Sequence, residues 1–383
     1  MDNTPLKQLL FFTYGVGPGT WIRSGLYQRE MKLYDEIQTF SIDTTFVFYE
    51  PNPTSATLIP YKYINLWPTY CSFLPSYLRS ITYLLYTLCS LPKLLCLASQ
   101  VDLLKTNQIP GSLVAVLVSL LSRKPLYVRA GYESYQFALF SLRNPVIKSF
   151  SFIQSLIAYH FAHSISITSE SAANFIVNTF GVSRSKITVH PNYVDTSFFI
   201  APQVEPPPSI LSVGRNKPQK RHSILLEAAT SISLPITIIG NSVKSSADIS
   251  VIPSNLTLME PVSPAVLAKT YSSNRYFVIL SEYEGHPKVL IEAMCSGLIV
   301  IACNAPGVSD NLLHLHNSIL IDPNPLALIQ AVHLLESDPG LRSRLRKRSL
   351  ELSHTLFSFD SYIDRELALC RHTVTMHSPP ARQ

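Results

Sequence analysis

Short apolar runs alternate along the chain with longer stretches in which apolar residues recur at helical spacing. Runs of this kind predict strands buried on both faces, and strands that alternate with helices indicate a parallel sheet. Helices are expected near 24–35 and 223–230. The predicted strands are 9–14, 44–49, 103–106, 126–129 and 164–168 in the first half, and 210–213, 236–239, 256–258, 276–280, 299–302 and 318–321 in the second. The pattern therefore predicts an α/β fold.

A proline-rich segment interrupts this alternation. Residues 201–209 read APQVEPPPS, and three consecutive prolines can continue neither a helix nor a central strand. The alternation starts again afterwards, so we expect two Rossmann-like domains, over 1–200 and 210–356, joined by this linker. A chain of 383 residues with 46% hydrophobic residues is long enough to form both cores.

Charge, cysteine and histidine usage exclude several classes of function. The net charge of +6 comes without a basic run, so nucleic-acid binding is not indicated. The six cysteines show no CxxC or zinc-like spacing, which favours free thiols in a reducing compartment. No metal is expected, because the histidines form no metal spacing and the sequence has no Asp-x-Asp pair. We expect no secretory signal, and no uncharged apolar stretch reaches about 18 residues.

The segment 281–308 carries the most specific pattern. It reads SEYEGHPKVLIEAMCSGLIVIACNAPGV and forms, with the preceding apolar run, a strand–loop–helix–strand unit. Pro287 suits the first turn of a helix and Gly297 suits the position just after its end, so a helix is expected over about 287–296. The N–H groups at about 286–289 would point into the loop, where a helix N-terminus attracts phosphate. Open α/β sheets bind nucleotides at this edge.

Two glutamates, Glu284 and Glu292, stand eight positions apart around this helix start. The carboxylate of Glu284 can accept hydrogen bonds from sugar hydroxyls. Glu292 has apolar neighbours, and a buried carboxylate needs a polar partner, which ribose hydroxyls would supply. The alternative is a glutamate that stabilises the helix dipole and an ordinary surface glutamate. The Gly-His-Pro-Lys string between them and the flanking strands favour a binding site.

A second polar motif follows the first predicted strand of the second half. Gly214 and Arg215 end this strand, and Lys220 follows five residues later. Arginine offers a planar fork for phosphate oxygens and lysine a compact charge, so the two cations can clamp a diphosphate and stabilise a leaving group. The alternative is a basic surface loop.

These motifs resemble the signatures of one enzyme family. The string EGHPK at 284–288, followed by EAM at 292–294, resembles the EGxPxxxxEAM signature of the retaining glycosyltransferases of family 4. Residues 214–220 resemble the family's G-R-x-x-x-x-K pattern. Residues 191–199 resemble its PNGVDT…F segment, with Tyr193 in place of the usual glycine.

The resemblance implies the GT-B fold, in which two Rossmann-like domains with parallel sheets face each other across a cleft. A C-terminal helix, here 357–375, would cross back to the first domain, followed by a disordered tail over 376–383. The implied reaction is retaining, metal-independent transfer of a hexose from a GDP- or UDP-linked sugar to a saccharide or lipid-linked saccharide, in glycan or polysaccharide biosynthesis. The nucleotide sugar is a substrate, and no cofactor is expected.

The resemblance also implies roles for residues of the second domain. It assigns the donor sugar to Glu284, the diphosphate to Arg215 and Lys220, and the ribose to Glu292. Further donor contacts are implied for Gly17, Gly214, Gly285, His286, Pro287, Lys288, Val289 and Leu290.

The first domain departs more from known patterns. Its loop Gly15–Gly19 lacks the third glycine of a dinucleotide fingerprint, and Glu50 lies about thirty rather than about twenty residues further on, which argues against a nicotinamide enzyme. In the glycosyltransferase interpretation the backbone near Gly17 contacts the donor phosphate. Many family members have a histidine where 130–131 reads Ala-Gly, so that histidine contact is absent here. Polar residues expected on the acceptor side are Lys105, Asn107, Arg129 and Tyr132.

One helical segment, 74–97, bears on the location of the protein. Its polar residues fall on one narrow stripe, and Pro92 is expected to end the helix. It is suited either to packing in the core or to lying at a membrane interface. We expect a cytoplasmic protein, and the second of these alternatives would bring it to the inner membrane face.

Two alternatives on a similar fold stay open. An epimerase would need acid and base groups at the sugar carbon, and a phosphorylase would need a pyridoxal-binding lysine; neither can be placed. A catalytically silent sugar-nucleotide binding protein is the other alternative, against which the intact Glu284, Glu292, Arg215 and Lys220 argue.

Overall fold

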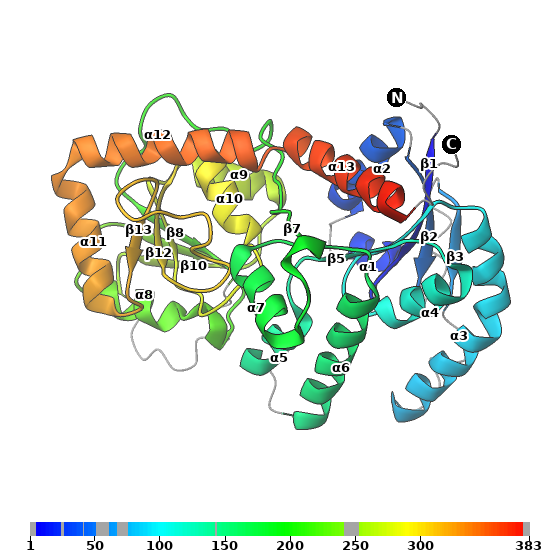
Figure 1. The fold of residues 1–383 in the computed structure, drawn as a ribbon. Helices are drawn as coiled ribbons and strands as arrows, with labels where there is room; N and C mark the ends of the chain where they lie inside the picture. The colour runs from blue at the N-terminus through cyan, green and yellow to red at the C-terminus, as the bar shows by residue number, and fades with distance from the viewer. Residues whose placement is uncertain are drawn as a thin grey trace. The chain divides into compact units, whose positions relative to one another are not determined.

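The computed structural model describes residues 5–23, 27–40, 42–50, 61–66, 76–141, 144–240 and 253–377. The chain divides into two compact units (Figure 1). The first unit comprises residues 1–167, 172–190 and 363–383, and the second comprises 168–171 and 191–362.

The first unit contains a seven-stranded parallel sheet with the order β3-β2-β1-β4-β5-β6-β7. Each strand pairs in parallel with its neighbour, for example Leu9 of β1 with Leu104 of β4. The strands are β1 Leu6–Phe11, β2 Ile42–Phe48, β3 Tyr63–Asn65, β4 Leu103–Thr106, β5 Leu126–Ala130, β6 Ser164–Ile167 and β7 Ile187–Val189. The helices along this part of the chain are α1 Pro18–Arg23, α2 Tyr27–Thr39, α3 Ser76–Ser99, α4 Ser112–Ser122, α5 Ser134–Ser141, α6 Pro145–Phe161 and α7 Glu170–Phe180.

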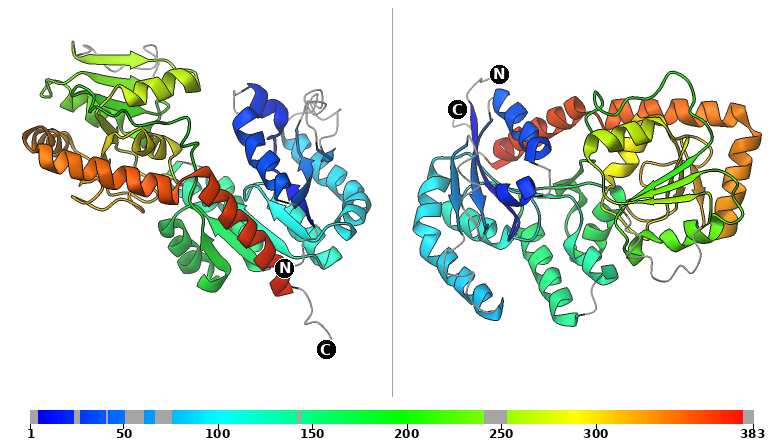
Figure 2. Two further views of the ribbon diagram at one scale, coloured as in Figure 1. Left: turned by 90° about the horizontal axis from the view of Figure 1, so that it is seen from above. Right: turned by 180° about the vertical axis from the view of Figure 1, so that it is seen from behind.

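The apolar runs of the sequence bury both faces of this sheet. In β1, Leu9 and Phe11 pack in one core cluster, while Leu10 and the following Phe12 pack in another. The second cluster contains residues of α1 and α2, and the first contains residues of α3, α4, α6 and α7. Figure 2 (left) shows α2 in blue and α3 in cyan on opposite faces of the strands. A sheet covered on both faces needs continuous apolar strands rather than alternating ones.

The second unit contains a six-stranded parallel sheet with the order β10-β9-β8-β11-β12-β13. Its strands are β8 Ile210–Val213, β9 Ile236–Ile239, β10 Leu256–Met259, β11 Tyr276–Ile279, β12 Ile299–Cys303 and β13 Ile319–Ile321. The helices along this part of the chain are α8 His222–Ala228, α9 Pro264–Ser272, α10 Lys288–Cys295, α11 Pro325–Ser337, α12 Pro339–Leu356 and α13 Phe359–His377. The predicted α/β fold with two Rossmann-like domains is confirmed. In each sheet the strand order reverses once, between β1 and β4 and between β8 and β11, and ligands bind at such switch points.

The last helix connects the units. α13 begins in the second unit, and its residues from Ile363 onward belong to the first. Just before the helix, Ser358 forms an isolated parallel bridge with Val194. That the two sheets face each other across a cleft stays a prediction, and the tail after His377 lies outside the described residues.

One predicted helix end is wrong. α3 continues through Pro92 to Ser99 instead of stopping there. Proline lacks the N–H that would bond the carbonyl four residues earlier, on Leu88. Both residues are exposed, so water can satisfy that carbonyl and the helix tolerates the interruption. No helix in the described ranges is both long and apolar enough to cross a membrane.

The start of α4 packs closely on β1 at a glycine. Gly111 has a φ of 107°, and a Cβ there would lie 2.3 Å from the carbonyl oxygen of Phe12. Gly181 has a similar φ of 67° but no heavy atom within 4 Å of its Cβ position. Substitutions at these two glycines therefore distinguish the cost of a positive φ from the cost of a close contact with neighbouring backbone.

We expect Gly111→Ala to lower the free energy of unfolding by about 3 kcal/mol, because it adds an overlap with backbone to the cost of positive φ. Gly181→Ala should cost about 1 kcal/mol, from φ alone. Urea denaturation of both variants measures the difference. Equal losses would show that the close approach to Phe12 contributes nothing.

Candidate functional site

The loop between β11 and α10 is held in a defined conformation by its own backbone. The Glu284 N–H donates to the carbonyl oxygen of Pro306 at 2.9 Å. Gly307, with a φ of 72°, passes so close that a Cβ there would lie 2.0 Å from the Glu284 carbonyl oxygen. The Gly307 N–H in turn donates to the Asp310 carboxylate at 2.9 Å. These contacts fix where the Glu284 side chain leaves the loop.

The structure brings together two of the charged residues of the predicted donor site, Lys220 and Glu284. The Lys220 ammonium lies 2.5 Å from Glu284 Oε1, and both side chains are largely buried. Gly214 makes room for the lysine, because a Cβ there would lie 3.2 Å from Lys220 Cε. These residues follow β8 and β11, the strands on either side of the switch point.

Arg215, which directly follows Gly214 in the chain, differs from Lys220 in its surroundings. Its side chain is exposed, and within the described ranges it makes no hydrogen bond or ion pair inside the chain. Its guanidinium is therefore available to an anionic ligand. This arrangement favours an anion such as a diphosphate.

His286 is held from both sides of its ring. The Asn192 N–H donates to His286 Nδ1 at 3.2 Å, and the Asn311 side-chain nitrogen lies 3.2 Å from Nε2. The Asn192 side chain also donates to the His286 carbonyl oxygen at 2.7 Å. With only 6% of its surface exposed, His286 positions the loop rather than presenting its ring to solvent.

The helix start deviates from the prediction by one residue. α10 covers Lys288–Cys295, with Pro287 at the N-cap and Ser296 at the C-cap. Gly297 has a φ of 77°, as expected for the position after a helix end. The Lys288 ammonium lies 5.3 Å from the centre of the Tyr193 ring, a cation–π contact.

The contacts of Tyr193 account for a tyrosine where the resembled pattern has a glycine. Its ring packs against Phe359 and Tyr362, at 5.0 and 4.5 Å between ring centres. Only 8% of its surface is exposed. A glycine here would leave this aromatic cluster, and the contact with Lys288, without its central ring.

Glu292 is buried and has a partner that the sequence did not reveal. The Tyr271 hydroxyl lies 3.1 Å from Glu292 Oε2 and 3.2 Å from the Val289 carbonyl oxygen. Burial and the nearby Glu292 carboxylate raise the pKa of Tyr271 well above its usual value, so it stays a donor. Tyr271 therefore orients the carboxylate of Glu292. The sequence signal for it, an apolar position of α9, cannot be told from an ordinary core residue.

In the first unit, the carboxylate of Glu50 lies against the glycine loop Gly15–Gly19. The Gly19 N–H donates to Glu50 Oε2 at 3.1 Å, and a Cβ at Gly17 would lie 2.7 Å from the same oxygen. Arg23 lies 3.6 Å from Glu50 Oε1. The loop from Gly15 to Gly19 thus cradles an internal anion at the start of α1.

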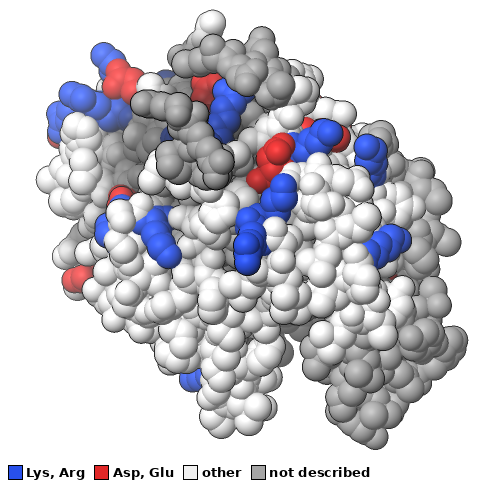
Figure 3. All heavy atoms as spheres, turned by 45° about the vertical axis from the view of Figure 1, so that its right-hand side comes forward, with Lys and Arg blue, Asp and Glu red and all other residues white. Residues whose placement is uncertain are grey.

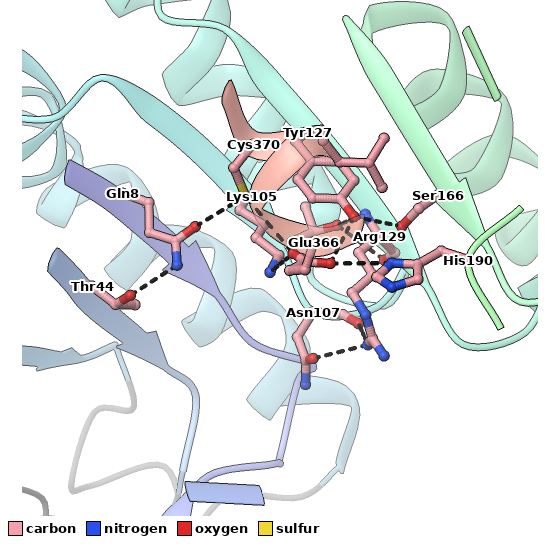
Figure 4. Close-up of polar contacts among 12 residues, drawn as sticks. Gln8, Thr44, Lys105, Asn107, Tyr127, Arg129, Ser166, His190, Glu366 and Cys370 are labelled. Atoms are coloured by element: carbon pink, nitrogen blue, oxygen red, sulfur yellow. Dashed lines mark hydrogen bonds and ion pairs between the residues drawn. The ribbon is translucent and has the colours of Figure 1, made fainter. Parts of the chain in front are cut away.

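A buried network occupies the middle of the first sheet (Figure 4). The Lys105 ammonium pairs with Glu366 of α13, and both side chains are almost fully buried. His190 Nδ1 lies 3.2 Å from Glu366 Oε2, and the Tyr127 hydroxyl lies 3.2 Å from the same oxygen. Cys370 contacts Glu366 one turn further along the helix.

The charge states in this network follow from competing effects. Burial alone would raise the pKa of Glu366, but the Lys105 ammonium and the hydrogen bond from His190 hold that pKa well below its usual value. Burial lowers the pKa of His190 despite the nearby carboxylate. Burial also raises the pKa of the Cys370 thiol. The network is therefore a Lys⁺–Glu⁻ pair with a neutral histidine.

The other residues expected on the acceptor side lie at the ends of β4 and β5. Arg129 Nη1 donates to the Asn107 carbonyl and side-chain oxygens at 3.3 and 3.4 Å. Tyr132 is half-buried and packs on Phe137 at 4.6 Å. Lys105, by contrast, is committed to Glu366 inside the sheet. Arg129 and Asn107 thus form a polar pair, and the Arg129 charge also helps to lower the pKa of the nearby Glu366.

A histidine at position 131 would require the Gln108 side chain to move. The Gly131 N–H donates to the Gln108 side chain at 2.9 Å, and a Cβ at Gly131 would lie 2.8 Å from Gln108 Nε2. The Gln108 amide therefore occupies the space beside Gly131. Among the described residues, no group of three or more His, Cys, Asp or Glu side chains could hold a metal ion.

Part of the second unit matches a known protein family. Residues 194–351, most of the second unit, match the family model described as glycosyl transferases group 1. An uncharacterized glycosyltransferase of Haemophilus influenzae is 33% identical over 85 residues, 22% of this chain. The aligned part spans about a quarter (24%) of that relative's length.

Solved structures match over nearly the whole chain. HepE of Anabaena, in complex with UDP and glucose, is 15% identical with a TM-score of 0.70, covering 97% of this chain and 100% of HepE. Sucrose-phosphate synthase of Thermosynechococcus elongatus is 15% identical with a TM-score of 0.73, covering 97% of this chain and 100% of that one. This chain has the GT-B fold. A glycosyltransferase of Rickettsia africae shares it at 14% identity and a TM-score of 0.73, covering 97% and 99% of the two chains.

The buried ion pair of this GT-B protein can be tested directly. We expect Glu366→Gln to lower the free energy of unfolding by about 3 to 5 kcal/mol, because it leaves Lys105 buried without a counter-charge. Asp364→Asn, an exposed change on the same helix, should stay within about 0.5 kcal/mol of the parent. Urea denaturation compares the two. Equal stability of both variants would refute the importance of the Lys105–Glu366 pair.

A pH effect is expected at His222, which opens α8 next to Lys220. Burial, with a smaller effect of the Lys220 charge, lowers the pKa of His222 to about 4. The unfolded chain binds this proton near pH 6.5, so the contribution to stability is present above that pH and is lost as the pH falls toward 4.

We therefore expect the parent protein to lose up to about 1.4 kcal/mol of stability per pH unit in this window relative to His222→Gln. Urea denaturation at several pH values between 6.5 and 4.5 measures the slopes. His316→Gln, at an exposed position, serves as the control and should keep the parental slope. If His222→Gln keeps that slope as well, His222 is protonated in the folded state.

Proposed function

We propose that this protein transfers a hexose from a nucleotide-diphosphate sugar to a saccharide or lipid-linked saccharide acceptor, with retention of configuration and without a metal. The observation that carries the proposal is the Lys220–Glu284 pair at the switch point of the second sheet, beside the start of α10. Such a position suits a nucleotide, and the pair supplies a phosphate ligand and a sugar ligand at one place.

Each donor group has a proposed partner. Arg215 and Lys220 hold the diphosphate, assisted by Gly214 and by backbone N–H groups at the start of α10. Glu284 binds hydroxyls of the sugar, and Glu292, oriented by Tyr271, binds the ribose. Donor contacts are further proposed for the backbone of Gly285, His286, Pro287, Lys288, Val289 and Leu290, and for Gly17 of the first unit.

The acceptor would be held by the first unit, through Asn107, Arg129 and Tyr132, with Lys105 acting behind them through Glu366. The acceptor hydroxyl oxygen bonds to the anomeric carbon as the bond from that carbon to the diphosphate oxygen breaks. The departing diphosphate takes the hydroxyl proton on the same face of the sugar. Arg215 and Lys220 stabilise the charge that develops on it.

Among nucleotides, UDP is the first to test, because HepE, with the same fold, has been seen with UDP and with UDP-glucose. We place the reaction in the cytoplasm, at the inner membrane face where a lipid-linked acceptor would be available. The product would enter glycan or polysaccharide biosynthesis.

The test is turnover of UDP- and GDP-sugars by two site variants. We expect Lys220→Ala and Glu284→Ala to lower kcat/KM by about a hundredfold or more, because each removes a group that contacts the reacting part of the donor. The matched control is Glu282→Ala. Glu282 lies two residues away, pairs with Arg221 at 3.3 Å and is 45% exposed.

The results discriminate clearly between assignments. Full activity of both site variants would refute the assigned site. Binding of a nucleotide sugar without transfer or hydrolysis would identify a silent binding protein instead. Conversion of the donor sugar to its epimer would identify an epimerase.

A further inference from the structure

A pocket on the first unit is lined by basic and apolar side chains. Its volume is about 670 Å³, and it is formed by the ends of α4, α6 and α13 and by the turns that lead into β5, β6 and β7. Among the described residues that line it there is no acid, and six of the eleven can carry a positive charge: Arg123, Lys124, His160, His163, Lys186 and His377. We call it the basic pocket.

The basic pocket lies at the edge of the sheet where the strands begin. Lys124 precedes β5, His163 directly precedes β6, and Lys186 directly precedes β7. Arg129, a proposed acceptor residue, lies near the other end of β5. An extended chain rises about 3.3 Å per residue, so roughly 16 Å of backbone separate Lys124 from Arg129. The pocket is therefore a different place from the proposed acceptor site.

Hydrogen bonds to the backbone orient two histidine rings of the pocket. His163 Nδ1 accepts from the Leu126 N–H at 3.1 Å, so Nε2 of the neutral ring carries the hydrogen. His377 Nε2 lies 3.0 Å from the Arg123 carbonyl oxygen. The two rings meet edge to face, with 4.4 Å between their centres. The position of the His163 N–H donor is thus set by the fold.

Only part of the positive charge is needed at the helix ends. Lys186 Nζ donates to the carbonyl oxygens of Ala162 and His160, at 3.1 and 3.4 Å, where α6 ends. Such a cation stabilises a helix C-terminus without any ligand. The Arg123 guanidinium and the Lys124 ammonium, by contrast, make no hydrogen bond or ion pair in the described part of the chain. These two charges are available to a ligand.

The backbone of Arg123 supports a role for its side chain. Arg123 ends α4 in the left-handed conformation, with a φ of 57°. Glycine adopts this conformation readily, whereas a side chain makes it unfavourable. No hydrogen bond or ion pair of the guanidinium within the described ranges offsets that cost. A bound anion would offset it, and strain of this kind is typical of binding sites.

Acidic residues of the surrounding elements lie away from the pocket. Over residues 103–190 the only acids are Glu133, which follows β5, and Glu170, which follows β6, both beyond the far ends of these strands. Asp102 precedes β4 and is the acid on the same edge of the sheet as the pocket. Its carboxylate accepts from the Lys7 N–H of β1 at 2.9 Å, on the side of β4 away from β5. The pocket charges are therefore not neutralised by these acids.

The last helix also brings no acid to the pocket. The acid of α13 that comes last in the sequence is Glu366, eleven positions before His377, and it is paired with Lys105. A preponderance of basic over acidic side chains is also visible in Figure 3, where the right-hand side of Figure 1 comes forward.

Exposed apolar side chains complete the lining. Leu120, Phe161 and Met376 are 53, 46 and 74% exposed. An inorganic ion would leave these side chains in water. A molecule that joins an anionic group to an apolar part would cover them and gain free energy from their burial.

We infer that the basic pocket binds a small organic phosphate, with the phosphate group at the cations and the apolar part of the molecule on the exposed apolar side chains. Arg123 and Lys124 supply charge to the phosphate oxygens, and His163 Nε2–H donates to one of them. The inference goes beyond the proposed sugar transfer and does not depend on it, because no residue of the pocket belongs to the donor or acceptor assignments.

NMR of the histidine rings in the full chain tests the site with sulfate as the first probe. The His163 signals are assigned by their loss in His163→Gln. Burial, with the nearby charges of His377 and Lys186, lowers the pKa of His163. Sulfate stays a dianion between about pH 5 and 8, so its binding should raise the pKa of His163 by about half a unit or more relative to chloride at equal ionic strength.

Phenyl phosphate and inorganic phosphate, compared at pH 8, test the class of ligand. Both should shift the His163 signals with saturation. Phenyl phosphate should bind about tenfold more tightly, because covering roughly 60 Å² of apolar surface corresponds to a factor of that size. Equal affinities would show that the pocket takes an inorganic ion and would overturn the assignment to an organic phosphate.

Arg123→Gly with Lys124→Gln separates binding from folding. Glycine relieves the positive φ, so the midpoint of thermal unfolding should not fall, while the affinity for phenyl phosphate should fall about tenfold or more. The matched control is Arg344→Gln with Arg348→Gln, two exposed positions of α12, which should keep the parental affinity.

Two further results would overturn the inference. Neither probe could shift the His163 signals with saturation, or the Arg123–Lys124 variant could bind phenyl phosphate as tightly as the parent. Transferase activity plays no part in these measurements, so the failure of either proposal leaves the other standing.

Discussion

The buried pair of Lys105 and Glu366 is the interaction on which the architecture of the first unit most depends. It joins a central strand to the last helix of the chain, across 261 positions of sequence. A buried carboxylate without a partner would be costly, and so would a buried ammonium, so each requires the other. His190 and Tyr127 satisfy the second carboxylate oxygen. The strand, the helix and the end of β7 are therefore specified together rather than separately.

Close backbone approach is the second constraint, and it acts at both switch points. Gly111 lets the start of α4 lie against the end of β1, and Gly307 lets the chain after β12 lie against the Glu284 loop. In neither place is there room for a side chain. Gly240 is a third such position, where a Cβ would lie 2.7 Å from the Gly214 carbonyl oxygen. The polar groups of the candidate site are thus placed by backbone contacts as much as by side chains.

Much of this architecture could be predicted from local pattern. Apolar runs identified the strands except β3 and β7, the two short strands at the edges of the first sheet. Pro287 with Gly297 located α10 to within a residue. Local pattern did not predict a contact whose partner is distant in the sequence, and it did not predict a group that is satisfied by water. The partner of Lys105 lies on another helix, Tyr271 looks like any apolar residue of α9, and the carbonyl freed by Pro92 is exposed. The sequence was enough to assign the strand ends to a site. It was not enough to predict which polar groups pair with one another inside a unit.

The glycine loop of the first unit has a consequence for how the two halves divide their work. Both sheets have the same order around their switch points, and in both a loop after the first strand begins a helix or turn. In the second unit that place holds the cations Arg215 and Lys220. In the first, the Gly19 N–H already donates to the carboxylate of Glu50. An anion that binds this N–H would have to displace that carboxylate. Two units of similar plan thus differ in charge at this place, since the second presents cations and the first an internal carboxylate.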